Sequence, residues 1–361
     1  MHPRVTLREI AAKAGVHHTT ASRALKNDPR VQADTLAKIR SIAEEMGYMP
    51  DPMLASLNAY RHASRVSPYH GTIAWITNFP TRDGWRESSC YEFYFQGARE
   101  QLMRHGYQLE EFWLRETDLS ARRASQVLLH RGIRGLLICP LAISRGHLSL
   151  EWEKFSAVSF GYSLVRPKLH LFSAAHYRAM ITAMRKLRAQ GYRRIGMVTS
   201  HEMNERMDWI WTAAYRADLP KPLRGQIPPV CLLKAKARAS STNLDNDFKP
   251  MVLKWFRTHK PEAIITPTIP VVEWLTEEGY QVPKDVAVVC ASLHHGGITT
   301  GIVEASREIG CAAANFLVGM LQRGEYGIPT IPQRVLLEGT WYTAKPAGKE
   351  SQAVLAKASL S

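Results

Sequence analysis

The clearest alternation of hydrophobic and polar positions runs from residue 5 to residue 25, VTLREIAAKAGVHHTTASRAL. Apolar residues recur there every three or four positions, which predicts two short amphipathic helices. Gly15 stands between them, at the kind of position where a helix ends in a left-handed residue. The pattern therefore predicts two helices joined by a tight turn.

The first of these helices carries a start signal. Thr6 and Glu9 have the spacing of a capping box, in which each side chain bonds a backbone N–H at the helix start. Val5 and Ile10 occupy the two positions of a hydrophobic staple around that cap. We therefore expect Thr6 to cap the helix.

The second helix, residues 17–25, has a polar face that packing within the pair does not explain. Ala21, Ala24 and Leu25 can pack inward, and the side chains left outside are His18, Thr19, Ser22 and Arg23. Such a face suits a recognition helix in the major groove of DNA. An ordinary helical hairpin is the alternative, because Ala-rich helices joined at a glycine are common.

A third helix is predicted from Val31 to Gly47, with Leu36, Ile39 and Ile42 on one face. It completes a compact headpiece over residues 1–50. Residues 51–70 follow as a hinge helix and linker, because an Asp-Pro pair suits a helix start. A helix this short is marginal alone, so we expect it to order only against a partner.

From residue 71 to 345 apolar strand segments alternate with amphipathic helices, with one continuous helix expected from Glu205 to Ala217. Repeated βαβ units predict an α/β fold with parallel sheets, and the length favours two lobes. We place the N-lobe at about 71–168 and 299–329, and the C-lobe at about 169–298 and 330–345. Residues 346–361 are predicted to be a flexible tail.

The composition indicates a polyanionic partner and a reducing compartment. The net charge is +15 and the pI is about 9.7, and basic side chains bind phosphates by releasing counterions. The five cysteines are scattered and form no C-x-x-C pair. The N-terminus lacks the apolar core of a signal peptide, and no apolar run is long enough for a membrane span. We therefore expect a cytoplasmic, nucleoid-associated protein.

The sequence shows no zinc-ligand spacing, no phosphate-binding glycine loop and no G-x-S-x-G or HExxH motif. The His294-His295-Gly296-Gly297 segment could suggest a metal site. We interpret it as an ordinary loop, because the sequence identifies no third ligand. Neither catalysis nor a bound metal or cofactor is predicted.

The headpiece, the hinge and the two-lobed body together resemble those of the lactose/galactose-repressor (LacI/GalR) family of transcriptional regulators. The resemblance covers about residues 5–345, and its most specific segment runs from Val5 to Leu57. It implies a helix-turn-helix headpiece, a periplasmic-binding-protein-like body and repression from a pseudo-palindromic operator. It also implies a homodimer with a small-molecule effector between the lobes. The tail has too few apolar positions at heptad spacing to predict a tetramer.

The resemblance also implies which residues contact DNA. The family's base-reading positions fall on His18 and Thr19, with a later polar contact at Arg23. The positions that touch phosphates or support the recognition helix are Thr6, Thr20 and Ser22. His17 replaces the family's usual capping serine, which weakens the expected helix start and phosphate contact there.

Leu57 matches the hinge-helix leucine that wedges into the minor groove and kinks DNA. Simple packing within the hinge helix is the alternative role for this side chain. Ala55 replaces a polar residue at the position two before it, which weakens the expected minor-groove contacts.

The body departs from the family where sugar hydroxyls are usually held. Pro267-Thr268-Ile269 replaces an Asn-Asp segment, and Cys290-Ala291-Ser292-Leu293 replaces a Gly-aromatic-Asp segment. Arg206 keeps the family's effector-contacting arginine, although Trp209 replaces the usual glycine. These changes favour an anionic or aromatic effector over a polyhydroxylated sugar. The candidate effector contacts are Trp85, Arg206, Trp209, Thr268 and Ser292.

Three alternatives remain open. The cleft could be vestigial, with control by a partner protein. A solute-binding protein of the same fold would need export, which the headpiece argues against. An enzyme on the same body would need a catalytic motif. For the tryptophans, packing in the core is the competing interpretation.

Overall fold

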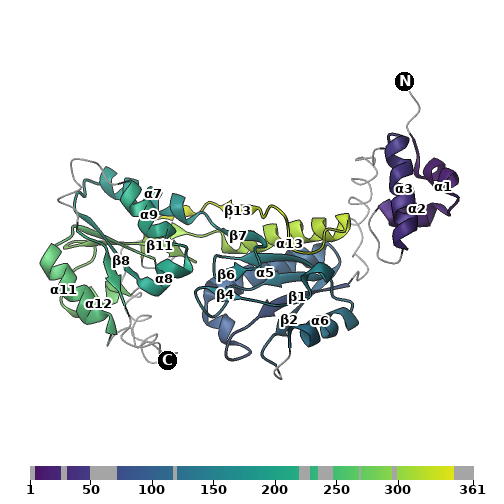
Figure 1. Cartoon of the computed structure of the whole chain (residues 1–361). Helices are drawn as coiled ribbons and strands as arrows, with labels where there is room; N and C mark the ends of the chain where they lie inside the picture. The colour runs from purple at the N-terminus through teal and green to yellow at the C-terminus, as the bar shows by residue number, and fades with distance from the viewer. Residues whose placement is uncertain are drawn as a thin grey trace.

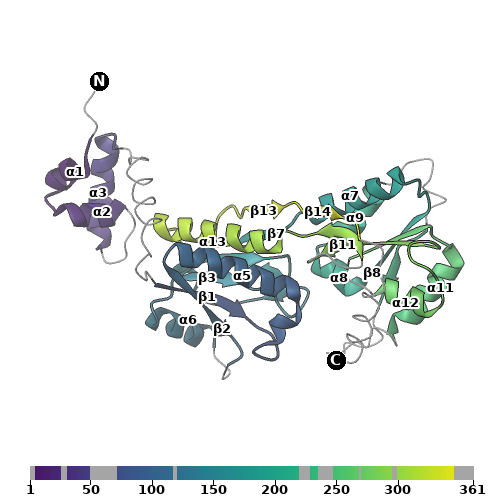
Figure 2. The same ribbon diagram turned by 180° about the vertical axis from the view of Figure 1, so that it is seen from behind.

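The computed structural model shows a three-helix headpiece and two α/β lobes (Figures 1 and 2). The residues that the structure describes are 5–25, 31–48, 71–116, 120–218, 228–234, 247–267, 270–294 and 299–344. Within these ranges no helix is long and apolar enough to cross a membrane. The predicted hinge with Leu57, Thr268 and the predicted tail lie outside the described residues.

The headpiece contains helices α1 (Leu7–Ala14), α2 (His18–Leu25) and α3 (Ala33–Glu45). The predicted capping box is confirmed: the Thr6 N–H donates to Glu9 Oε2 at 2.6 Å, and the Glu9 N–H donates to Thr6 Oγ1 at 3.4 Å. Gly15 ends α1 with φ 69°, as the turn requires. Local signals therefore specify this helix pair.

The three helices bury a small shared core. The buried side chains are Ile10, Ala11, Ala14, Ala21, Ala24, Ile39 and Ala43. Val5 packs against this cluster, in agreement with the predicted staple. Short alanines on α2 let the helices approach closely and leave its polar residues outside.

The N-lobe is a six-stranded, all-parallel sheet of order β13-β7-β5-β3-β1-β2. Its strands are β1 (Gly71–Thr77), β2 (Tyr107–Trp113), β3 (Gly135–Ile138), β5 (Ser156–Phe160), β7 (His170–Ala174) and β13 (Arg334–Leu337). Helices α5 (Ser89–Arg104) and α13 (Ser306–Arg323) cover one face, and α6 (Ala121–His130) covers the other. Strands β4 (Gly146–His147) and β6 (Leu164–Arg166) form a separate pair, and short 3-10 helices span Gly84–Glu87 and Trp152–Lys154.

The C-lobe repeats this layout in the order β14-β12-β11-β10-β8-β9, with only β14 antiparallel. Its strands are β8 (Ile195–Ser200), β9 (Cys231–Leu233), β10 (Ala263–Thr266), β11 (Ala287–Leu293), β12 (Thr300–Val303) and β14 (Thr340–Tyr342). Helices α7 (His176–Ala189) and α9 (Ile210–Ala217) lie on one face. Helices α11 (Lys249–His259) and α12 (Val271–Glu277) lie on the other, and α8 (His201–Arg206) follows β8.

The chain crosses between the lobes three times, and each crossing comes later than the predicted boundaries. The predicted boundaries put the residues of β7 in the C-lobe and those of β12 in the N-lobe, but β7 joins the N-lobe sheet and β12 the C-lobe sheet. The same boundaries put the residues of β13 in the C-lobe, but β13 pairs with β7 of the N-lobe. These boundaries were wrong because a short apolar strand carries no local mark of the sheet it joins.

The predicted continuous helix from Glu205 to Ala217 was also wrong. It is split into α8 and α9, because Asp208 and Trp209 adopt φ 51° and 60°. The buried Asn204 holds the break, since its carbonyl accepts the Trp209 N–H at 2.7 Å. Its side-chain oxygen also accepts the Thr212 hydroxyl at 2.7 Å. Helical spacing of apolar residues continues across the break and hides it.

Helices α5 and α13 of the N-lobe touch backbone to backbone. A Cβ at Gly97 would lie 1.9 Å from the Arg307 carbonyl oxygen, and one at Gly310 would lie 2.1 Å from that of Tyr94. Only glycine permits this approach. The contact brings the N-terminal ends of both helices together at the edge that faces the C-lobe (Figure 1).

We predict that Gly310→Ala lowers the free energy of unfolding by about 1–3 kcal/mol, because rigid backbone must move to admit the methyl group. Denaturant unfolding of the full chain measures this. Gly319→Ala in the same helix is the control, since its Cβ meets only the flexible end of Arg323. Equal effects of the two substitutions would contradict the prediction.

Candidate functional sites

The outer face of α2 is polar and accessible. His17, His18, Thr19 and Arg23 are exposed, and Thr20 and Ser22 are half-buried beside the core alanines. The face is held by packing from behind, so its side chains are presented on a fixed helix. This arrangement can place several hydrogen-bonding groups against one surface at once.

The start of α2 is organised by the unusual His17. The Thr20 and Ala21 N–H groups donate to its carbonyl at 2.9 and 3.2 Å. Its Nδ1 lies 2.9 Å from Thr19 Oγ1, and its ring lies 4.3 Å from that of His18, centroid to centroid. His17 therefore orients Thr19 and His18, the two residues predicted to contact bases.

Thr6 is exposed at the start of α1. Its hydroxyl is engaged with Glu9, donating to Oε2 at 3.0 Å. Any phosphate contact from Thr6 would therefore have to share that hydroxyl with the capping box.

A second candidate site is a cavity of about 110 Å³ between the two lobes. Tyr91, Tyr94, Pro140 and Tyr162 line it from the N-lobe. Its C-lobe side is lined by His176, Met203, Arg206, Trp211, Ser292, His294 and Glu304. Open parallel sheets bind ligands beyond the carboxyl ends of their strands, and several of these residues follow such ends.

Arg206 joins the lobes across this cavity. Its Nη2 donates to the Tyr91 hydroxyl at 2.7 Å and to the Leu141 carbonyl at 2.6 Å, both on the N-lobe. Burial raises the pKa of Tyr91, so the phenol stays protonated while Arg206 bonds to its oxygen. The guanidinium is thus a hydrogen-bonded strut between α8 and the N-lobe.

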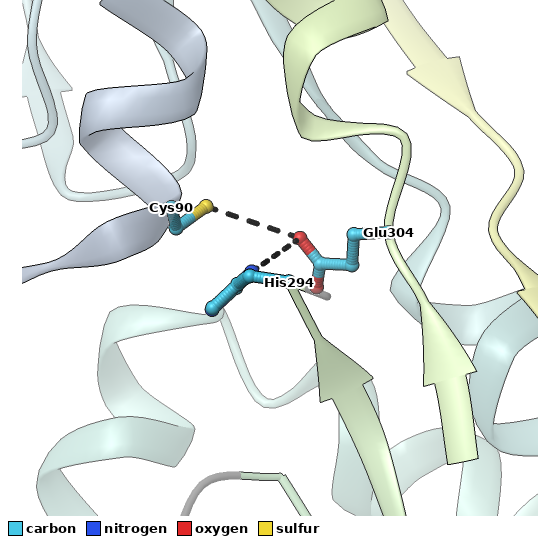
Figure 3. Close-up of side chains that lie close together, drawn as sticks. All are labelled: Cys90, His294 and Glu304. Carbon is cyan, nitrogen blue, oxygen red and sulfur yellow. Dashed lines mark hydrogen bonds and ion pairs between the residues drawn. The ribbon is translucent and has the colours of Figure 1, made fainter. Parts of the chain in front are cut away.

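Glu304 is a buried carboxyl at the same junction. Ser292 Oγ donates to its Oε1 at 2.5 Å, and His176 Nδ1 lies 3.5 Å from that oxygen. Its other oxygen, Oε2, lies 4.0 Å from Cys90 Sγ and 4.0 Å from His294 Nδ1 (Figure 3). Burial raises the pKa of Glu304 to about 7.

Two polar nitrogens at the cavity wall are buried without a hydrogen-bond partner among the described residues. They are His176 Nδ1 and Trp211 Nε1. Burial, reinforced by His294, lowers the pKa of His176 to about 3, so its ring is neutral. Buried donors and acceptors are normally satisfied, so these two nitrogens are groups of the wall with which a bound molecule could pair.

The structure brings together only some of the residues that were predicted to contact an effector. Arg206 and Ser292 line the cavity. Trp85 is fully buried in the N-lobe core, where Nε1 donates to Glu111 Oε2 at 3.2 Å. Trp209 lies outside the cavity lining, 38% exposed, with its ring edge-on to His201.

Several cavity residues were missed by sequence reasoning, chiefly Cys90, Tyr91, His176 and Glu304. The available signal was Glu304, a single acid at the end of the apolar strand segment of β12. Its partners lie on distant segments, so only the fold reveals the cluster.

Two segments of the chain match known protein families. Residues 6–51 match the family described as bacterial regulatory proteins, lacI family. Residues 184–343 match the periplasmic binding protein-like domain.

Similarity to individual proteins extends over nearly the whole chain. The HTH-type transcriptional regulator PtxS of Pseudomonas plecoglossicida is 25% identical over 88% of this chain and 90% of its own length. Among solved structures, the transcriptional regulator CelR–cellobiose complex has a TM-score of 0.54 at 19% identity, covering 94% of this chain and 99% of that one. The lac repressor dimer bound to operator and the anti-inducer ONPF has a TM-score of 0.54 at 17% identity, covering 95% and 99%.

We predict that Arg206→Met lowers the free energy of unfolding by about 1–3 kcal/mol, because the Leu141 carbonyl loses a charged donor. Chemical denaturation of the full chain measures this. Arg178→Met is the matched control, since Arg178 and Glu338 are both largely exposed and such pairs contribute about 0–1 kcal/mol. An equally small effect at Arg206 would show that the strut does not stabilise the lobes.

Proposed function

The chain belongs to the LacI family of bacterial regulatory proteins, and on that premise we propose that it is a dimeric repressor controlled by a ligand between its lobes. Members of this family are helix-turn-helix transcriptional regulators with an effector-binding domain. The observation that carries the DNA-binding part is the exposed polar face of α2, backed by the headpiece core.

DNA recognition would use that face in the major groove. His18 and Thr19 are oriented by His17 and would contact base edges, with Arg23 as a later contact. Thr6, Thr20 and Ser22 would bind phosphates, which fix position without reading sequence. The net charge of +15 adds a sequence-independent attraction to DNA that weakens as salt rises.

Dimerisation would supply two headpieces for one operator. Two-fold related helix-turn-helix units bind half-sites about 34–36 Å apart, or a multiple of this, which requires a near-palindromic sequence. In the proposed mechanism Leu57 enters the minor groove between them. We propose a homodimer as the binding unit.

The inter-lobe cavity would provide the control. A ligand there would contact both lobes and favour one angle between them, and that angle would set the hinge. Ligand and operator affinities would then be reciprocally coupled. Two observations support a ligand at this position: the Arg206 strut, and Trp211 Nε1, which has no hydrogen-bond partner in the described part of the chain.

We predict that Thr19→Ala and His18→Ala each weaken operator binding about 5–150-fold, the equivalent of about 1–3 kcal/mol for a lost base contact. The operator is first selected from genomic DNA with the full-length protein, and affinity is then measured by fluorescence anisotropy. Ser41→Ala is the matched control, because Ser41 is an exposed hydroxyl on α3.

The expected control result is an unchanged affinity. If the full chain shows no sequence preference for any DNA over a range of salt concentrations, the proposed function is wrong. If Ser41→Ala weakens binding as much as Thr19→Ala, α2 is not the reading helix.

A further inference from the structure

Three potential metal ligands meet at the junction of the lobes: Cys90, His294 and Glu304. Cys90 lies at the start of α5 in the N-lobe, and the other two lie just after β11 and β12 in the C-lobe. We propose that they bind a divalent transition-metal ion, zinc being the best fit. The site stands on its own geometry and does not depend on DNA binding.

The side chains converge on one point (Figure 3). One donor atom from each residue lies within 4.8 Å of the others, and Glu304 Oε2 is 4.0 Å from both Cys90 Sγ and His294 Nδ1. Tetrahedral zinc with ordinary bond lengths separates such donors by about 3.4–3.6 Å. A bound ion would therefore draw each donor inward by only a fraction of an ångström.

The donor set selects the class of metal. Thiolate, imidazole and carboxylate are the ligands that zinc takes, whereas magnesium and calcium prefer oxygen alone. A thiolate and a carboxylate together carry two negative charges, which a divalent ion neutralises in this buried place. Binding to the thiol form of Cys90 would release its proton to solvent.

Neighbouring residues supply the hydrogen bonds that orient the ligands of a metal site. Ser292 Oγ donates to Glu304 Oε1 at 2.5 Å and leaves Oε2 directed at Cys90 and His294. Hydrogen bonds of this kind orient ligating carboxylates. His176 Nδ1 lies 3.5 Å from Oε1, outside the group of three donors, so a solvent molecule would complete a tetrahedral site.

The three side chains meet at distances that leave room for an ion. Cys90 Sγ and His294 Nδ1 each lie 4.0 Å from Glu304 Oε2, whereas the short hydrogen bond from Ser292 Oγ goes to the other carboxyl oxygen, Oε1. A metal would satisfy the carboxyl, the thiol and the imidazole together. Because Cys90 belongs to one lobe and the other two ligands to the other, the ion would also clamp the lobes.

The test uses metal-free full-length protein titrated with Co²⁺ as an optical probe, followed by displacement with Zn²⁺. We expect one ion per chain, visible bands typical of tetrahedral cobalt and a near-ultraviolet thiolate-to-cobalt band. Cys90→Ser should abolish the thiolate band and weaken Zn²⁺ binding by no less than the about 10–100-fold that loss of a mere outer-shell partner costs.

Two further variants complete the design. Cys311→Ser removes another N-lobe thiol that lies outside the donor set and should bind cobalt like the parent. Glu304→Gln keeps the side-chain shape, so it should fold and still lose about 10–100-fold in affinity. Cooperative thermal unfolding checks that each variant is folded.

The proposal is overturned if the parent binds no stoichiometric Co²⁺ or Zn²⁺. It is also overturned if folded Cys90→Ser and Glu304→Gln both bind cobalt with the parent's affinity and spectrum. Since no readout involves DNA, these outcomes are distinguishable from a failure of the proposed repressor function.

Discussion

The close packing of α5 against α13 is the constraint on which the body depends. At Gly97 and Gly310 the helices meet without side chains between them, which fixes their separation and register. Cys90 lies at the start of α5, and Glu304 directly precedes α13. The contact between α5 and α13 therefore helps to set where Cys90 and Glu304 lie relative to each other in the inter-lobe cavity.

The two lobes are joined by polar contacts at the cavity. Arg206 reaches from α8 to the Tyr91 hydroxyl and the Leu141 carbonyl, and Glu304 gathers side chains from both lobes. Polar contacts of this kind are directional, so a ligand that replaces or adds one shifts the preferred arrangement.

Much of the headpiece follows from local sequence. The capping box at Thr6, the left-handed Gly15 and the helical spacing of apolar residues each act within a few positions, so the sequence predicted them correctly. The body's alternation of strands and helices is equally local. The lobe to which a strand belongs is not a local property. The predicted boundaries put the residues of β7, β12 and β13 in the wrong lobe, because the partners of a strand lie far away in the chain.

By itself the sequence determined the pair of helices joined by a tight turn, the exposed polar face of the second helix, the α/β class and the family resemblance, since all of these are encoded in short-range patterns. Only the tertiary structure placed Trp85 in the core and Trp209 outside the cavity. It also brought Cys90 to Glu304 across 214 positions. No sequence spacing encodes that encounter, because Cys90 and Glu304 lie in different lobes that are brought together only by the tertiary fold.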